Sequence, residues 1–195
     1  MILASASQTR ARLLGDAGVT FEIVPARVDE DALKQSLLVE KASHRDIADA
    51  LAELKALRVS ASRPGELVLG ADQVLSFDGA LISKCESLAE ARELLLCLRG
   101  KAHDLISAIV LAKNGAPVWR HVGKATLTMR DFSDSFLDDY LAQEGEGLLS
   151  GVGCYRLESR GAQLFSRVNG DHSTVLGLPL IPLLSALREQ GVIAK

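Results

Sequence analysis

Two hydrophobic periodicities alternate along this chain of 195 residues. Between residues 44 and 62, four apolar side chains recur at spacings of three and four, as on one face of a helix: Ile47, Leu51, Leu54 and Leu57. The run LVLGADQVLSF at 67–77 is instead almost continuously apolar and rich in strand-forming residues. Because helical and strand patterns follow one another, with hairpins between strands, we expect an α/β fold, a mixed sheet flanked by helices.

The same patterns set approximate element boundaries. They predict helices at 9–17, 44–62, 87–98, 133–142 and 181–190. They predict strands at 1–4, 21–24, 67–77, 80–83, 103–111 and 118–129, and a strand pair at 154–157 and 163–168. The dipeptides Asp78-Gly79 and Asn114-Gly115 indicate hairpin turns. The acidic residues at 29–31 and the glycine-rich stretch at 145–153 are expected to be loops.

Length, net charge and cysteine content limit the classes of function that the chain can have. The length suits one domain over 1–195, which two lobes can share. The net charge of -3, with both signs interspersed, argues against a nucleic-acid polymer as partner. Three widely spaced cysteines (Cys85, Cys97 and Cys154) indicate free thiols in a reducing compartment. Because residues 1–20 do not resemble a signal peptide and no apolar run is long enough to cross a bilayer, we expect a cytoplasmic location and no membrane partner.

One carboxylate stands out. Asp72 lies inside the apolar strand pattern, where an ionised side chain is rarely found without a partner. A metal ion or a cation would explain it. Strand alternation could equally place it on a solvent-exposed face, and this stretch alone does not decide between the two interpretations.

Other polar residues have ordinary explanations one at a time. Ser5 and Ser7 can cap a helix, Lys55 and Lys84 can lie at the surface, and the lone His103 is by default a structural or exposed imidazole. Considered together, a serine-rich helix start with Arg10, two lysines and two acids (Glu30 and Asp72) suit a phosphate-bearing ligand. Neither a Walker A motif nor a kinase-type glycine loop is present.

Five sequence blocks together resemble the Maf family of nucleoside triphosphate pyrophosphatases, first described as septum-formation inhibitors. They are LASASQTRARLL (3–14), VDE (28–30), GADQV with DGALISK (70–84), LRGKAH (98–103) and GDHSTVLGLPL (170–180). The resemblance covers nearly the whole chain. It implies two lobes around a deep cleft, similar to the inosine triphosphate pyrophosphatases, and it admits a homodimer.

The resemblance also implies roles for individual residues. Ser5, Ser7, Arg10, Lys55 and Lys84 fall on substrate-binding positions, with Lys84 also in the catalytic set. Asp72 falls on the proposed general base, and Glu30 and Asp72 together would hold Mg²⁺ or Mn²⁺. The implied reaction converts a nucleoside triphosphate into a monophosphate and pyrophosphate, as a house-cleaning activity.

Two departures from the family pattern concern residues beside the site. Lys84 is flanked by Ser83 and Cys85 instead of the usual glycine and proline. The stretch LLSGVGCY at 148–155 lacks the lysine that many members carry there. A phosphate contact from this second stretch is therefore not expected.

The resemblance implies that base choice depends on positions that fall here on Thr9, Gln73 and Glu158. Gln73 and Glu158 resemble the 7-methyl-GTP subgroup, whereas an enzyme for dTTP or UTP is the alternative within the family. A carboxylate suits the N1–H and amino group of guanine and attracts a cationic methylated ring. Two other classes remain open, a nucleotide-binding regulator of cell division without catalysis and a protein-interaction module.

Overall fold

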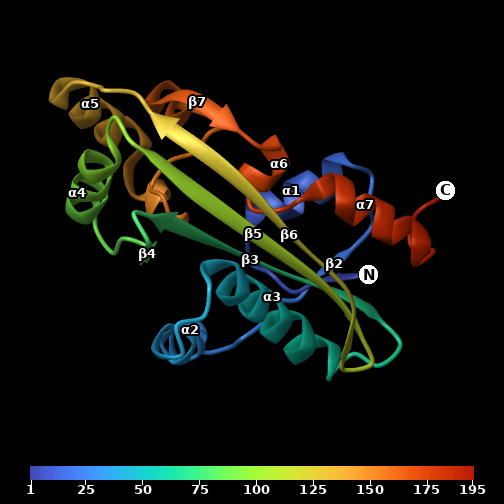
Figure 1. Ribbon diagram of the computed structural model, residues 1–195. Helices are drawn as coiled ribbons and strands as arrows, with labels where there is room; N and C mark the ends of the chain where they lie inside the picture. The colour runs from blue at the N-terminus through green and yellow to red at the C-terminus, as the bar shows by residue number, and fades with distance from the viewer. The chain divides into compact units, whose positions relative to one another are not determined.

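The structure is a computed structural model that describes residues 1–195, and it is an α/β protein (Figure 1). One mixed sheet of seven strands has the order β2-β1-β3-β5-β6-β7, with β4 paired to β3. The predicted mixed sheet with flanking helices is thereby confirmed. The chain divides into two compact units: unit 1 comprises Met1–Gln73, Ile106–Gly123 and Asp171–Lys195, and unit 2 comprises Val74–Leu105 and Lys124–Gly170. The division into two lobes around a deep cleft stays a prediction.

Unit 1 contains the parallel part of the sheet and most of the long helices. Its elements are β1 (Ile2–Leu3), α1 (Gln8–Asp16), β2 (Glu22–Ile23), α2 (Glu30–Val39), α3 (His44–Ser60), α6 (His172–Val175) and α7 (Leu180–Glu189). Strands β3 (Leu67–Phe77), β5 (Ala102–Lys113) and β6 (Ala116–Met129) each contribute one part to unit 1 and one part to unit 2. Strand β1 pairs in parallel with both β2 and β3.

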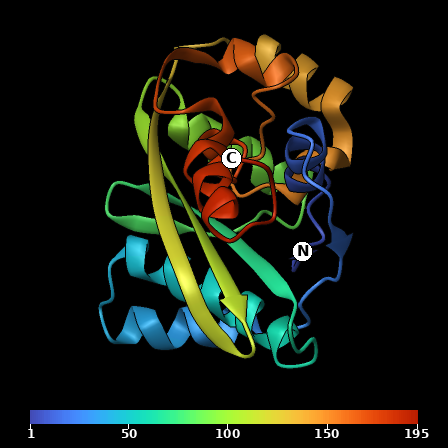
Figure 2. The same cartoon turned by 90° about the vertical axis from the view of Figure 1, so that its right-hand side faces the viewer.

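Side-chain alternation on β3 sorts the helices of unit 1 into two layers. Leu69 and Ala71 pack in one buried cluster with Leu14 of α1 and Leu183 of α7. Val68 points the other way and clusters with Val59 of α3. Figure 1 accordingly shows α1 and α7 on one face of the strands and α3 on the other, and Figure 2 shows α2 beside α3.

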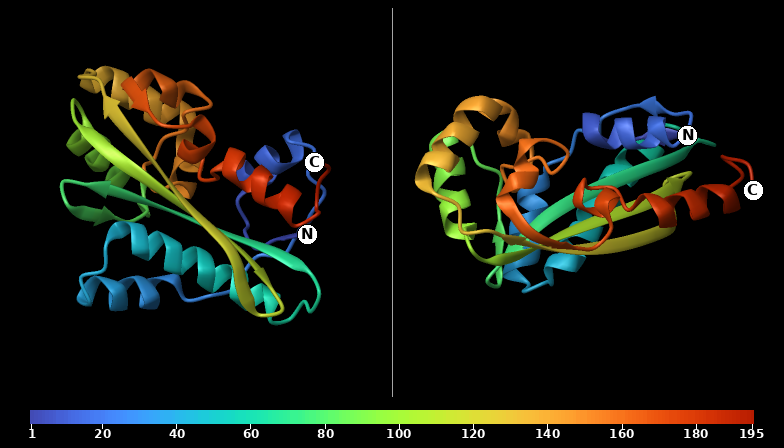
Figure 3. Two further views of the ribbon diagram at one scale, coloured as in Figure 1. Left: turned by 45° about the vertical axis from the view of Figure 1, so that its right-hand side comes forward. Right: turned by 90° about the horizontal axis from the view of Figure 1, so that it is seen from above.

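Unit 2 holds the hairpin and the shorter helical segments. Its complete elements are β4 (Ala80–Ile82), α4 (Leu88–Leu98), α5 (Asp134–Glu144), the 3₁₀ helices η1 (Gly145–Ser150) and η2 (Arg160–Leu164), and β7 (Phe165–Asn169). Strand β4 pairs antiparallel with β3, and β7 pairs antiparallel with β6. Helices α4 and α5 pack against each other and against η1 (Figure 3). No helix of the structure combines the length and the apolarity needed to cross a membrane.

Three local expectations were wrong. The glycine-rich stretch at 145–153 is not all loop, because Gly145–Ser150 form the 3₁₀ helix η1. The acidic stretch is not a loop, because Asp29 caps a helix that starts at Glu30 and accepts the backbone N–H of Ala32 at 3.0 Å. Acidic residues stabilise a helix N-terminus, so the same residues that suggested a loop begin α2. The predicted strand at 154–157 is absent, because Cys154 has a φ of 53°, and β7 takes β6 as its partner. That left-handed φ is incompatible with strand geometry.

Candidate functional site

Asp72 lies in unit 1 on the face of β3 that packs against α3. Asp72 is only 7% exposed, and its Oδ1 accepts a hydrogen bond from Lys55 Nζ at 2.6 Å. The alternative that placed Asp72 on a solvent-exposed strand face is therefore wrong. A carboxylate buried at this depth needs a charged or hydrogen-bonding partner, and Lys55 is that partner.

Close packing of α3 on β3 lets Lys55 reach this carboxylate. An added Cβ at Gly70 would lie 2.2 Å from the carbonyl oxygen of Ala52 and 2.6 Å from the backbone nitrogen of Ala56, both on α3. Glycine at position 70 and alanines on the facing helix thus allow the two backbones to approach. Glycine inside a strand pattern is a signal for close backbone approach, and the sequence reasoning missed it.

Glu30 joins the same cluster from the first turn of α2. Its Oε1 lies 3.0 Å from Lys55 Nζ, and its side chain is 42% exposed. The Lys55 ammonium group therefore bonds two carboxylates. Asp72 Oδ1 and Glu30 Oε1 can be no farther apart than the sum of their distances to Lys55 Nζ. Asp29 was not among the predicted site residues. As the N-cap of α2 it fixes the start of this helix and therefore the position of Glu30, the first helical residue.

The serine-rich opening forms a capped helix start, as the ordinary explanation predicted. Ser7 is the N-cap of α1, and its Oγ accepts the backbone N–H of Arg10 at 3.3 Å. Ser5 Oγ accepts the backbone N–H of Ser7 and Nη1 of Arg10, both at 3.2 Å. Thr9 lies in the same first turn and is partly buried. The two serines therefore shape the turn from which the Arg10 guanidinium extends.

Arg10 connects three parts of unit 1. Its Nε donates to the carbonyl oxygen of Gly177 at 2.8 Å, and its Nη1 donates to the carbonyl oxygen of Ala71 at 3.1 Å. Burial lowers the pKa of Arg10, while the nearby carboxylates of Asp72 and Glu30 act in the opposite direction. The bonds to the chain use Nε and Nη1, so a phosphate contact would fall to Nη2. Replacement of Arg10 would consequently affect folding as well as binding.

Gln73, the next residue on β3, is held by its amide nitrogen. Nε2 lies 2.9 Å from both Ser107 Oγ and the carbonyl oxygen of Val175, and 3.2 Å from the carbonyl oxygen of Thr174. Ser107 in turn donates to the Thr174 carbonyl oxygen at 2.8 Å. Because both amide hydrogens of Gln73 are engaged in these bonds, the side chain would contact a nucleobase through Oε1, which can only accept hydrogen bonds.

Two predicted residues belong to unit 2. Lys84 follows β4 and is exposed, and Glu158 is exposed in the turn that precedes η2. Unit 1 thus brings together Ser5, Arg10, Glu30, Lys55 and Asp72. The roles of Lys84 and Glu158 stay predictions.

The charges and the oxygen ligands of the unit 1 cluster bear on whether it can hold a metal ion. The unit 1 cluster contains two cations, Arg10 and Lys55, and two carboxylates, Glu30 and Asp72, so their formal charges cancel. A triphosphate bears several negative charges and calls for more positive charge than this cluster supplies. No three His, Cys, Asp or Glu side chains are grouped so that they could hold a metal ion by themselves. Two carboxylates completed by substrate phosphates and water are, however, a common way to bind Mg²⁺, and Glu30 and Asp72 fit it.

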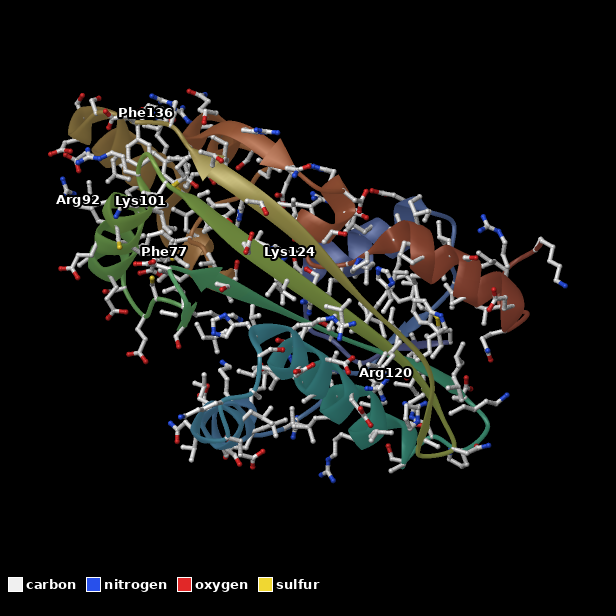
Figure 4. The ribbon with its side chains drawn as sticks, viewed as in Figure 1. Phe77, Arg92, Lys101, Arg120, Lys124 and Phe136 are labelled. Carbon is white, nitrogen blue, oxygen red and sulfur yellow. The ribbon has the colours of Figure 1, made fainter.

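A second acidic and basic cluster in unit 1 serves as a comparison. Arg120 of β6, labelled in Figure 4, donates to Asp49 Oδ2 at 2.6 Å and to Glu53 Oε2 at 2.8 Å, both on α3. The Arg120 side chain is 44% exposed, and its hydrogen bond to the Asp49 carboxylate, which accepts it, raises the pKa of Arg120. This cluster joins the same helix to the sheet without any predicted site residue, so it provides a matched control for mutation.

Comparison with known proteins gives a consistent result. A family model described as Maf-like protein matches residues 1–190. A nucleoside triphosphate pyrophosphatase of Caulobacter vibrioides is 56% identical over 191 residues, which cover 98% of this chain and 96% of that protein. A protein of the same name from Granulibacter bethesdensis is 51% identical, with 97% and 96% covered. A 7-methyl-GTP pyrophosphatase of Rhizobium meliloti is 49% identical over 193 residues, with 99% and 97% covered.

Proposed function

The chain belongs to the Maf family, and from that premise we propose that it hydrolyses nucleoside triphosphates to monophosphates and pyrophosphate. The relatives described above, with about half of their residues identical to this chain, carry names for that activity. The observation that carries the proposal is the buried Asp72 carboxylate, paired with Lys55 at 2.6 Å and close to Glu30 and Arg10.

In this mechanism Asp72 acts on the attacking water. Its carboxylate orients the water and accepts its proton while the water oxygen attacks the α-phosphorus, the bond to the bridging oxygen breaks and pyrophosphate leaves. Lys55 keeps the Asp72 side chain in one orientation, because its ammonium group is fixed between Asp72 and Glu30. A general base held in place typically contributes a hundredfold or more to the rate, on the order of 10²–10⁴.

Phosphate binding falls to the cationic groups. The first-turn amides of α1 and the Nη2 group of Arg10 bind phosphate oxygens, because helix N-termini favour anions and a charged guanidinium N–H forms strong hydrogen bonds with phosphate. Lys84 adds a further positive charge, an assignment supported by the family pattern alone. Glu30 and Asp72 would hold Mg²⁺ or Mn²⁺, which would neutralise phosphate charge during the reaction.

A nucleotide panel tests the proposal. Purified protein is incubated with several nucleoside triphosphates, with Mg²⁺ and with EDTA, and pyrophosphate, orthophosphate and monophosphate are quantified. We expect pyrophosphate and monophosphate in equal amounts, and only with the metal ion. A protein that binds nucleotides without forming products would instead support the cell-division regulator, and one that neither binds nor cleaves them would support the interaction module.

Replacing Lys84 by alanine should lower turnover without affecting stability. Lys84 is exposed, and exposed substitutions usually change the free energy of unfolding by no more than about 0.5 kcal/mol. A lost charge-assisted phosphate contact costs more than that. The measurement is kcat/KM beside a urea unfolding curve. Unchanged kcat/KM would remove Lys84 from the site.

For the base, we propose that this protein prefers a modified guanine nucleotide such as 7-methyl-GTP over dTTP and UTP. A 7-methyl-GTP pyrophosphatase is among its relatives at 49% identity. Glu158 and the Oε1 atom of Gln73 are acceptors, which suit the N1–H and amino group of guanine. Uracil and thymine offer one N3–H between two carbonyl oxygens, which a carboxylate repels. Thr9, which cannot stack on a base, leaves the dTTP or UTP enzyme as the alternative.

The Glu158→Gln variant tests base choice. We expect the ratio of kcat/KM for 7-methyl-GTP to that for UTP to fall about tenfold, the effect of losing about 1.4 kcal/mol of discrimination. GTP and dTTP are measured beside them. A wild-type protein that already prefers UTP or dTTP would contradict the proposed preference.

A further inference from the structure

The segment that carries Glu158, between the 3₁₀ helices η1 and η2, has a defined conformation although it contains no α-helix or strand. It begins after Cys154, a fully buried residue with a φ of 53°. A cysteine keeps a left-handed backbone only where its surroundings impose it. Tyr155, the next residue, makes the contacts that anchor this segment.

Tyr155 is anchored by His103, at the start of β5. The Tyr155 hydroxyl and His103 Nε2 are 2.7 Å apart, and His103 is only 3% exposed. The Tyr155 ring also meets Phe165 edge-on, with ring centroids 4.8 Å apart. All three residues belong to unit 2. Of the two ordinary interpretations of His103, a structural or an exposed imidazole, the structural one is thus confirmed, and the exposed one is wrong.

Both partners of this hydrogen bond are neutral. Burial lowers the pKa of His103 to about 4, which outweighs the opposite effect of Asp104. Burial likewise raises the pKa of the Tyr155 hydroxyl. The charge of Asp104 is balanced elsewhere, because it bonds Lys124 Nζ at 2.8 Å and Thr126 Oγ1 at 2.7 Å. His103 Nδ1 is buried without a hydrogen-bond partner. The hydrogen bond to the Tyr155 hydroxyl is therefore the polar contact that holds this imidazole.

Beyond Tyr155 the chain closes into a compact turn around Glu158. The backbone N–H of Ser159 donates to the carbonyl oxygen of Arg156 at 3.2 Å. An added Cβ at Gly161 would lie 2.4 Å from that same oxygen, so the turn leaves no room there. Arg156 Nη2 donates to the carbonyl oxygen of Gly147 at 2.8 Å. Glu158 is therefore attached to a closed turn whose entrance is fixed at Tyr155.

We propose that His103 and Tyr155 are positioning residues for base selection: their hydrogen bond fixes the turn at residues 156–161 and thereby aims Glu158 at the nucleobase. The inference rests on the proposed function, because it takes Glu158 as the base-selecting residue. Neither His103 nor Tyr155 needs to touch the nucleotide. The effect therefore belongs to the choice between bases, whereas the hydrolytic step depends on Asp72.

The test compares Tyr155→Phe with Thr126→Val. The first variant removes only the hydroxyl and keeps the ring, and the second removes a different hydrogen bond of unit 2, the one to Asp104. We expect the 7-methyl-GTP to UTP ratio of kcat/KM to fall about tenfold in Tyr155→Phe, mainly through KM, and to stay within about twofold in Thr126→Val. His103→Gln, which can still bond the hydroxyl, should keep most of the ratio, and His103→Leu should lose it.

A double variant separates failure of this inference from failure of the proposed function. If Tyr155 acts through Glu158, Tyr155→Phe has no further effect on the ratio once Glu158→Gln is present. Additive effects, or an unchanged ratio in Tyr155→Phe while Glu158→Gln lowers it, would overturn the positioning role alone. If Glu158→Gln leaves the ratio unchanged, base selection by Glu158 is wrong and the positioning role is overturned with it, whereas pyrophosphate release by the wild-type protein would still stand.

Discussion

The Asp72→Asn variant should turn over nucleoside triphosphates at least about a hundredfold more slowly than the wild-type protein while remaining folded. Asparagine keeps the shape of the side chain and can still accept a hydrogen bond from Lys55, but it cannot take a proton from water at neutral pH. The measurement is kcat at saturating nucleotide, with circular dichroism and a melting curve to establish that the variant is folded.

Asp49→Asn is the matched control for that experiment. Asp49 is an acid of the same unit that also bonds a cation across α3 and the sheet, with its Oδ2 2.6 Å from Arg120 Nη1. Its replacement should cost some stability and leave kcat within about threefold of the wild type, since surface and structural ion pairs contribute modestly. Equal activity losses in the two variants would contradict a catalytic role for Asp72.

The Gly70→Ala variant should show the largest loss of stability. The new methyl group would meet backbone atoms of α3 at 2.2 and 2.6 Å, which cannot move without shifting the helix. Overpacking of this kind costs about 3 kcal/mol. Because the shift would also move Lys55 away from Asp72, kcat should fall in the fraction that remains folded.

Gly15→Ala serves as the control for Gly70→Ala. Nothing lies within 4 Å of a Cβ added at Gly15, and the residue is inside α1. Alanine is the better helix former, so we expect unchanged or slightly higher stability, by about 0.5 kcal/mol. Urea unfolding of both variants decides the comparison. If Gly70→Ala is as stable as the wild type, the close packing of α3 on β3 is not what holds the cluster together.

Much of the fold could be predicted because local signals were strong. The continuous apolar run at 67–77 became β3 with the same bounds, and the helical spacing at 44–62 became α3. The Asn114-Gly115 turn joins β5 to β6 as expected. Helix α2 is not evident from the sequence, because a run of acidic residues fits a solvated loop as well as a capped helix start. The turn at 154–157 was missed because nothing local marks the left-handed Cys154.

The candidate site could be predicted in part, for a similar reason. The unusual position of Asp72 inside an apolar strand was visible in the sequence, but its partner was not, because Lys55 comes from a helix 17 residues earlier in the chain. The anchoring of Arg10 on the Gly177 carbonyl joins residues 167 positions apart. No local pattern predicts such contacts, because they depend on how the strands and helices of unit 1 pack.

The identity of the phosphate product tests the central claim most directly. Wild-type protein and the Asp72→Asn variant are incubated with the preferred nucleotide and Mg²⁺, and pyrophosphate, orthophosphate and monophosphate are counted in each reaction. We predict one pyrophosphate per monophosphate and no orthophosphate from the wild type, loss of both products in EDTA, and their loss in the variant. Release of orthophosphate, or full activity in EDTA, would contradict hydrolysis between the α- and β-phosphates at a metal-assisted Asp72 site.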